Sequence, residues 1–259
     1  YFLGTIANLI YNIGSGILRA VGDSKRPLYF LIASCFANII LDIVFVVYFH
    51  MGIAGAALAT IISQCVSAFL VIWVLVRTSD MYQLHFSKLG LDMRMLKRIV
   101  RIGLPSGLQS AMYTTSNIII QSSVNSLGTD TVAAWATYGK IDVIFWMIIS
   151  AFSISVTTFV GQNYGAGKMD RVRKGIRVCL GMSFVTLFLS LFLYNFGQYI
   201  FQIFTTDPAV LTIGMDVLHY LVPTFFTYII IEIYSGSLKG IGDSWFPMFL
   251  TMTGVCALR

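Results

Sequence analysis

Two carboxylates lie within apolar stretches of the sequence, where a charge needs an explanation. Asp42 is near the middle of an apolar run at 28–49, and Glu232 lies in a run that ends at Leu238. A charge at the centre of a membrane helix costs about 2.5–3.5 kcal/mol on insertion scales, so it needs a partner or a function. Asn38 precedes Asp42 by four residues, which places both on one helical face. Their oxygen atoms suit a proton or a small hard cation such as sodium.

Each of these acids also has a structural interpretation. Asp42 could accept hydrogen bonds from neighbouring helices, and Glu232 could bond within the bundle or with Lys239. Asp142 follows Lys140 near the start of another apolar run and is interpreted as half of a local ion pair. The sequence favours a functional role for Asp42 and leaves both roles open for Glu232.

A polar stripe distinguishes the apolar run at 103–126 from the others. Its polar side chains recur every four residues, at Gln109, Tyr113, Asn117 and Gln121. Lipid cannot satisfy such groups, so the stripe either lines a water-filled cavity or bonds helices together. Aromatic faces attract cations, which makes Tyr113, Trp135 and Tyr138 candidate contacts for a cationic substrate. Ordinary packing is the alternative for each ring.

The composition shows what kind of fold must hold these residues. Hydrophobic residues make up 57% of the 259, and charged residues only 11%, against about 25% in soluble domains. The sequence therefore predicts an all-α integral membrane protein, because apolar runs of about 20 residues suit spanning helices. The runs are 1–22, 28–49, 52–76, 103–126, 131–164, 178–204 and 213–239, and another begins at 245.

The hydrophilic segment from 77 to 102 divides the chain. We expect residues 1–76 and 103–259 to belong to two lobes joined by this basic linker. Within the linker, apolar residues at helical spacing predict an amphipathic helix on the membrane surface. These residues are Leu89, Met93, Leu96 and Val100.

One motif occurs twice, 220 positions apart. Residues 15–27 read SGILRAVGDSKRP and residues 235–247 read SGSLKGIGDSWFP, with seven of thirteen positions identical. A period of this length indicates two fused copies of one domain. The spacing also predicts that the chain is the central part of a longer protein.

The orientation follows from charge. Six expected spans separate the two motifs, so both Gly-Asp-Ser turns lie on one side of the membrane in a parallel repeat. That side holds fifteen of the seventeen Lys and Arg residues. By the positive-inside rule, we expect the turns and the linker to be cytoplasmic and the protein to be a multi-pass protein of the cell membrane.

Several motifs together resemble the multidrug and toxic compound extrusion (MATE) transporters. They are the two LxxxGDSxxP turns, MGIAGAALAT at 51–60, GLPSG at 103–107 and FVGQNYGAGK at 159–168. The resemblance covers the whole chain and implies helix 4 to helix 11 of twelve, in two six-helix lobes that form a V around a cavity. It implies an antiporter, driven by protons or sodium, that exports cationic amphipathic compounds.

The resemblance also assigns site residues. In the DinF-type branch an Asn-xxx-Asp pair, a Thr on the next helix and an Asp on the first helix form the cation site. Asn38, Asp42 and Thr60 match the first three of these residues, and we expect the first-helix Asp to lie outside this sequence. The NorM-type branch has two further acids at positions that are Tyr113 and Tyr228 here, which argues against a NorM-type site. Glu232, one turn beyond Tyr228, is the candidate substitute, and Tyr228 joins the candidate cavity residues.

Other functions are less well supported. A lipid-linked saccharide flippase of the same superfamily is the main alternative, although intramembrane Lys and Arg are scarce. A membrane-embedded enzyme would need clustered metal ligands or a nucleophile with a base, and a channel is less favoured than a carrier. We expect no cofactor, no metal other than sodium and no nucleic-acid partner, and a monomer in contact with membrane lipid.

Overall fold

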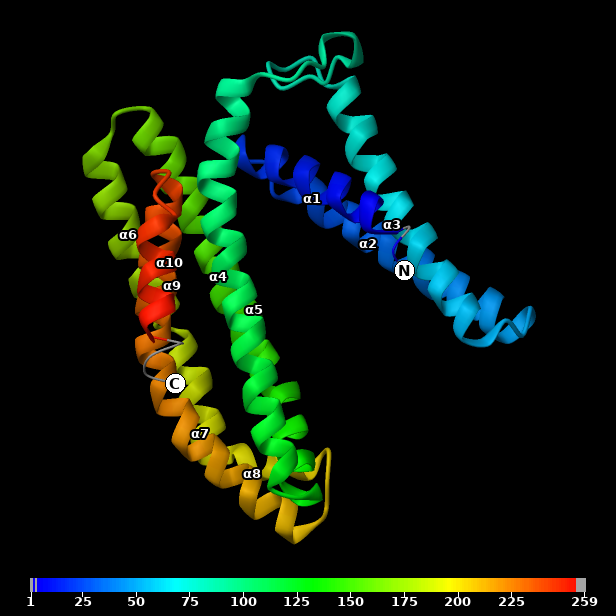
Figure 1. Ribbon diagram of the computed structural model, residues 1–259, viewed down its shortest axis with the longest axis vertical. Coiled ribbons are helices and arrows are strands. Elements are labelled where there is room, and N and C mark those ends of the chain that lie inside the picture. Colours follow the sequence, from blue (N-terminus) through cyan, green and yellow to red (C-terminus); the bar gives the residue numbers. More distant parts are fainter. Residues whose placement is uncertain (1, 3, 255–259) are drawn as a thin grey trace. The chain divides into compact units, whose positions relative to one another are not determined.

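A computed structural model describes residues 2 and 4–254, and this part of the chain is helical without a strand (Figure 1). It divides into two compact units, residues 1–91 and 92–259. Five described helical segments are long and apolar enough to cross a membrane. They are Lys25–Tyr48, Gly52–Arg77, Thr129–Gly165, Met169–Gln202 and Pro208–Gly240.

The first unit is a three-helix bundle. Helix α1 spans Gly4–Ala20, α2 spans Lys25–Asp42 and continues into a π-helix at Ile43–Tyr48, and α3 spans Gly52–Arg77. Helix α3 packs against both α1 and α2. The contact with α1 is close because Gly14 has no side chain: a Cβ there would lie 2.7 Å from Val71.

The second unit begins within the expected linker. Of the four residues at helical spacing there, Met93, Leu96 and Val100 lie in the first turns of α4, which runs unbroken from Met93 to Ser126, whereas Leu89 follows a short 3₁₀ turn, Phe86–Lys88. The side chain of Asp92 caps α4 by accepting from the backbone amides of Arg94 and Met95, which fixes the start of the helix. Helix α4 is absent from the five span candidates, since its polar stripe lowers its hydropathy.

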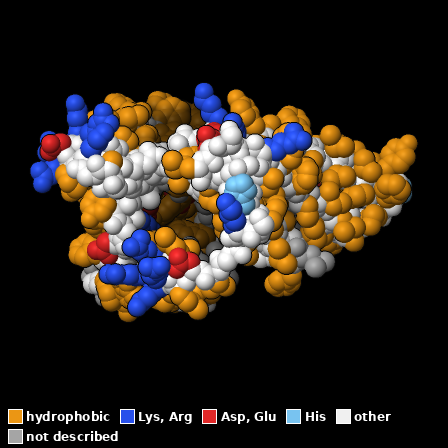
Figure 2. Space-filling model, turned by 90° about the horizontal axis from the view of Figure 1, so that it is seen from above, with side chains coloured by type: hydrophobic (Ala, Val, Ile, Leu, Met, Phe, Trp, Pro, Cys, Tyr) orange, Lys and Arg blue, Asp and Glu red, His pale blue; other side chains and the backbone are white. Residues whose placement is uncertain are grey.

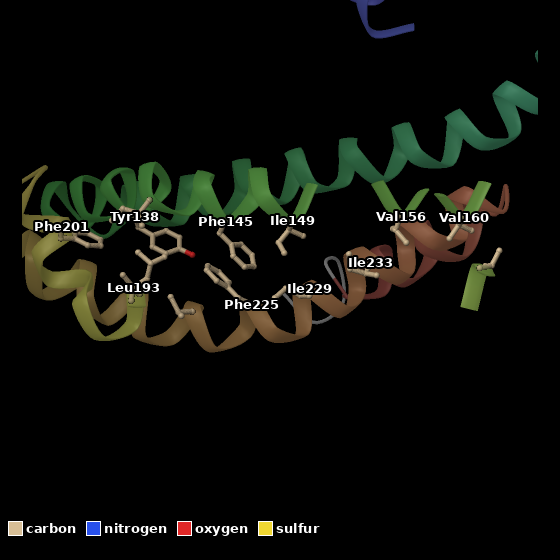
Figure 3. Close-up of a cluster of buried hydrophobic side chains, with 14 residues drawn as sticks. Tyr138, Phe145, Ile149, Val156, Val160, Leu193, Phe201, Phe225, Ile229 and Ile233 are labelled. Atoms are coloured by element: carbon tan, nitrogen blue, oxygen red, sulfur yellow. The ribbon is translucent and has the colours of Figure 1, made fainter. Parts of the chain in front are cut away.

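The remaining helices complete the second unit. They are α5 (Thr129–Gly165), α6 (Met169–Ser183), α7 (Thr186–Gln202), α8 (Pro208–Leu221), α9 (Phe225–Gly240) and α10 (Trp245–Met252). Helix α5 packs against α6, α8 and α9. Figure 3 shows the core between them, in which the rings of Phe145 and Phe225 stack at 3.9 Å. Side chains on the outer surface are largely apolar, as in a helix bundle that faces lipid.

The two copies of the repeated motif fold into the same turn. Gly22 and Gly242 have φ of 92° and 91°, a conformation that favours glycine. In each copy the amide after the glycine donates to a carbonyl five residues earlier, Asp23 to Leu18 at 2.9 Å and Asp243 to Leu238 at 3.0 Å. This Schellman pattern ends α1 and α9 alike. The repeat seen in the sequence is therefore a repeat of structure.

Candidate functional site

The three residues that the sequence assigns to cation coupling lie on two packed helices. Asn38 and Asp42 are one turn apart on α2, and Thr60 is on α3. All three are partly buried. We call this set the α2 site.

A hydrogen bond between α2 and α3 sets the relative positions of these residues along the helix axes. The Ser34 hydroxyl on α2 donates to the Ser63 carbonyl on α3 at 2.6 Å. The helices are consecutive and antiparallel, so moving four residues forward on α2 corresponds to moving about four back on α3. Because a helix rises about 1.5 Å per residue, the positions of Asn38 and Thr60 along the helix axes differ by only about 1.5 Å. The fold therefore places Thr60 and Asn38 at similar positions along their two helices.

Asp42 stands at a change in helix type. It is the last residue of α2 before the π-helix Ile43–Tyr48, and π-helical turns are frequent at functional sites. Its Oδ1 atom is buried and has no hydrogen-bond partner in the described structure. Asp142 Oδ1, Ser15 Oγ and Ser244 Oγ share this property. An unpaired carboxylate oxygen in an apolar span is costly unless a proton or a cation binds it. Sequence reasoning did not identify the π-helix.

The other polar atoms of the α2 site do not bond to Asp42. The Thr60 hydroxyl donates to the Ala56 carbonyl of its own helix at 2.9 Å, and its lone pairs remain able to accept a cation. Chemically, the site offers a carboxylate, an amide oxygen and a hydroxyl oxygen, a set suited to a proton or a sodium ion. Among the described residues, no cluster of three or more His, Cys, Asp or Glu side chains could hold a metal ion.

A second group of polar side chains lies in the other unit. It comprises Tyr113, Asp142, Trp146, Tyr228 and Glu232, and we call it the aromatic–carboxylate cluster. The Trp146 indole donates to Asp142 Oδ2 at 2.6 Å, and the Tyr228 hydroxyl donates to Glu232 Oε1 at 3.1 Å. The rings of Trp146 and Tyr228 meet edge-on, 4.3 Å apart, and Tyr228 also interacts with Tyr113. Two carboxylates are thus joined through two aromatic side chains.

The cluster corrects the interpretation of Asp142 as an ion-pair partner of Lys140. The Lys140 ammonium lies 5.3 Å from the centre of the Phe204 ring instead. The one ion pair among the described residues joins Arg26 and Asp23, so Glu232 has no ion pair with Lys239. The i, i+4 spacings of Asp142 with Trp146 and of Tyr228 with Glu232 could have indicated both contacts.

The polar stripe of α4 divides into residues with different surroundings. Gln109 is buried and donates to the Thr251 hydroxyl of α10 at 2.7 Å, so it bonds two helices together. Gln121 is exposed and bonds Asn125 on its own helix, and Asn117 is exposed. The candidate aromatic residues Trp135 and Tyr138 pack together at 5.7 Å, with Tyr138 buried.

The chain is similar in sequence to known multidrug resistance proteins. The chain is 30% identical over 260 residues to the probable multidrug resistance protein YpnP of Bacillus subtilis, covering all of this chain and 58% of that protein. It is 24% identical to the multidrug export protein MepA of Staphylococcus aureus, over 93% of this chain and 54% of MepA. The chain therefore spans little more than half the length of these relatives.

Solved structures share the fold. A MOP superfamily transporter from Pyrococcus furiosus matches with a TM-score of 0.87 and 23% identity, over 95% of this chain and 56% of that one. A MATE protein in complex with MaL6 matches with a TM-score of 0.86 and 23% identity, over 96% and 56%. The family model MatE matches residues 1–44 and 105–259. With its helical bundle, repeated turns and apolar spans, the chain belongs to the MatE family of multi-pass membrane proteins.

Proposed function

We propose that this protein is a cation-coupled antiporter that exports cationic amphipathic compounds by alternating access. A proton or a sodium ion drives export, and no cofactor takes part. The observation that carries the proposal is the buried, unpartnered Oδ1 of Asp42 within an apolar span. The names of the relatives YpnP and MepA, which refer to multidrug resistance and export, support the assignment of the substrate class.

The α2 site accounts for the coupling. A cation or proton bound at Asp42 offsets the cost of holding an unpaired carboxylate oxygen in the span. Occupied and empty states therefore favour different packing of the surrounding helices, and a ligand shifts populations by its difference in affinity for them. Asn38 and Thr60 supply the neutral oxygens that distinguish a sodium ion from a bare proton.

The aromatic–carboxylate cluster accounts for the binding of an organic cation. The ring faces of Tyr113, Trp146 and Tyr228 attract a delocalised positive charge, and Asp142 and Glu232 neutralise it. Trp135, which packs on the buried Tyr138, is a further aromatic candidate on α5. We further propose that the protein acts as a monomer in the cell membrane, with both Gly-Asp-Ser turns and the 77–102 segment on the cytoplasmic side, where most Lys and Arg residues gather.

The test is ethidium efflux from efflux-deficient cells that express the complete gene. Wild type is compared with Asp42→Asn at equal membrane abundance, while the proton and sodium gradients are collapsed in turn. Asp130→Asn, an exposed carboxylate in the first turn of α5, serves as the matched control. We expect Asp42→Asn to abolish efflux and Asp130→Asn to retain it, and the gradient that matters identifies the ion. Normal efflux by Asp42→Asn contradicts the coupling role. If the wild type exports no cationic dye, the result favours the alternative function, a lipid-linked saccharide flippase.

A further inference from the structure

A groove of about 890 Å³ lies between the second half of α5 and α6, within one unit. This volume is in the range of ligand-binding pockets. Its wall is largely apolar, and Phe152, Phe159, Val178 and Met182 are among the lining residues. The Phe159 ring occupies the space next to Gly175, where a Cβ would lie 2.1 Å from it. The missing side chain thus lets the ring form part of the wall.

One end of the groove is basic. Lys168, Arg171 and Lys174 line it, all three with exposed side chains. In the part of the chain that the structure describes, no carboxylate lies within 4 Å of these three cations. Figure 2 shows Lys and Arg side chains beside hydrophobic surface on the face of the molecule that it presents. An apolar wall that ends in unpaired positive charges is amphipathic.

The basic and apolar lining residues of α6 form one face of the helix. Arg171, Lys174, Val178 and Met182 recur at spacings of three and four residues, which aligns them along the helix. Arg173 and Arg177 do not line the groove. At about 100° per residue, Arg173 projects from the opposite side of α6 and Arg177 lies about 100° around the helix from the groove-lining face. The positive-inside rule explains why the 165–177 segment is basic, but not why three of its five Lys and Arg residues line one groove.

We propose that this groove binds one anionic glycerophospholipid. Its phosphate contacts Lys168, Arg171 and Lys174, and one acyl chain lies along Phe152, Phe159, Val178 and Met182. Basic pockets between membrane helices bind anionic headgroups in this way. A soluble anion would leave the apolar wall unused, and a zwitterionic lipid would bring a positive charge to the basic end. The proposal is independent of the transport function.

The test uses native mass spectrometry of the protein expressed from its complete gene and purified in mild detergent. The probes are phosphatidylglycerol and phosphatidylcholine with identical acyl chains, titrated separately. The variant Arg171→Gln/Lys174→Gln removes two groove charges. Arg173→Gln/Arg177→Gln removes two charges of the same helix that do not line the groove and is the matched control. Ser155→Phe fills the apolar part of the groove without changing charge.

We expect wild type and the control to retain one phosphatidylglycerol in preference to phosphatidylcholine. The groove variant should bind it about 10- to 30-fold more weakly, since each basic side chain contributes roughly a factor of five. Ser155→Phe should also lose the lipid. Equal losses in the two double variants would show general surface attraction and overturn the proposal. Equal retention of phosphatidylglycerol and phosphatidylcholine would also overturn it. So would a Ser155→Phe variant that binds phosphatidylglycerol as well as wild type does and releases it when inorganic phosphate is added.

Discussion

The indole nitrogen of Trp146 lies 2.6 Å from Asp142 Oδ2, one turn away on α5, and donates a hydrogen bond to it. The same ring contacts Tyr228 of α9, which in turn donates to Glu232. Trp146 therefore links two carboxylates that lie on different helices. Because the acceptor is a carboxylate, this hydrogen bond is stronger than one between neutral groups.

Replacing Trp146 by Phe keeps the ring but removes the donor. We expect the free energy of unfolding to fall by about 1.5–3 kcal/mol, the contribution of a hydrogen bond to a charged group. Thermal unfolding in detergent measures the effect. Trp245→Phe is the control, because Trp245 is similarly exposed, at 40% against 37%, and stacks on Phe249. Combining Trp146→Phe with Asp142→Asn should cost less than the sum of the single changes. Strict additivity would show that the bond contributes nothing.

Asp42→Asn separates the functional role of the α2 site from a structural one. The buried Oδ1 has no hydrogen-bond partner, so a neutral amide removes a desolvation cost without breaking a bond. We expect unchanged or higher thermal stability together with lost transport, as is typical of functional residues. Ser34→Ala, which removes the hydroxyl that donates to Ser63, should lower stability by about 1 kcal/mol. A comparable loss for Asp42→Asn would identify Asp42 as a structural residue.

The contact between α5 and α9 leaves no room for a side chain at two glycines. A Cβ at Gly236 would lie 2.8 Å from the Ser153 carbonyl oxygen, and one at Gly240 would lie 2.7 Å from that of Thr157. Either Gly→Ala change should destabilise the protein by about 1–3 kcal/mol through overpacking. Gly181→Ala on α6 has no atom within 4 Å of the new Cβ and should be neutral or slightly stabilising. The reverse order of stabilities would contradict this packing.

The two Gly-Asp-Ser turns should respond alike to mutation. Asp23 Oδ1 accepts from the amides of Lys25 and Arg26 at 3.1 Å, and Asp243 Oδ1 accepts from those of Trp245 and Phe246 at 3.1 and 3.3 Å. We expect Asp→Ala at either position to cost about 1 kcal/mol, whereas Asp→Asn keeps an acceptor and costs less. The exposed ion pair of Asp23 with Arg26 should add little. A large difference between the copies, seen in chemical unfolding, would show that the turns are not equivalent.

The sequence by itself determined the helical membrane fold and the repeat, and its spacing proposed Asn38 and Asp42 as neighbours in one site. Apolar runs of about 20 residues favour membrane-spanning helices, because every backbone polar group in lipid must be hydrogen-bonded within the protein. Helical periodicity likewise placed Asn38 and Asp42 on one face, and the glycine-containing turn was visible as a repeated motif. These properties are local, so they can be read from neighbours in the chain.

The tertiary structure decided which polar groups meet. Lys140 was expected to pair with Asp142, but packing places its ammonium over the ring of Phe204, which lies after α7. Asp142 instead accepts from Trp146 of its own helix. Gln109 donates a hydrogen bond to Thr251, 142 residues away in the sequence, because α4 packs on α10. Helix packing also sets the register between α2 and α3, through Ser34, and forms the groove between α5 and α6. Such contacts depend on the relative rotation and height of packed helices, which residue spacing within one helix does not specify.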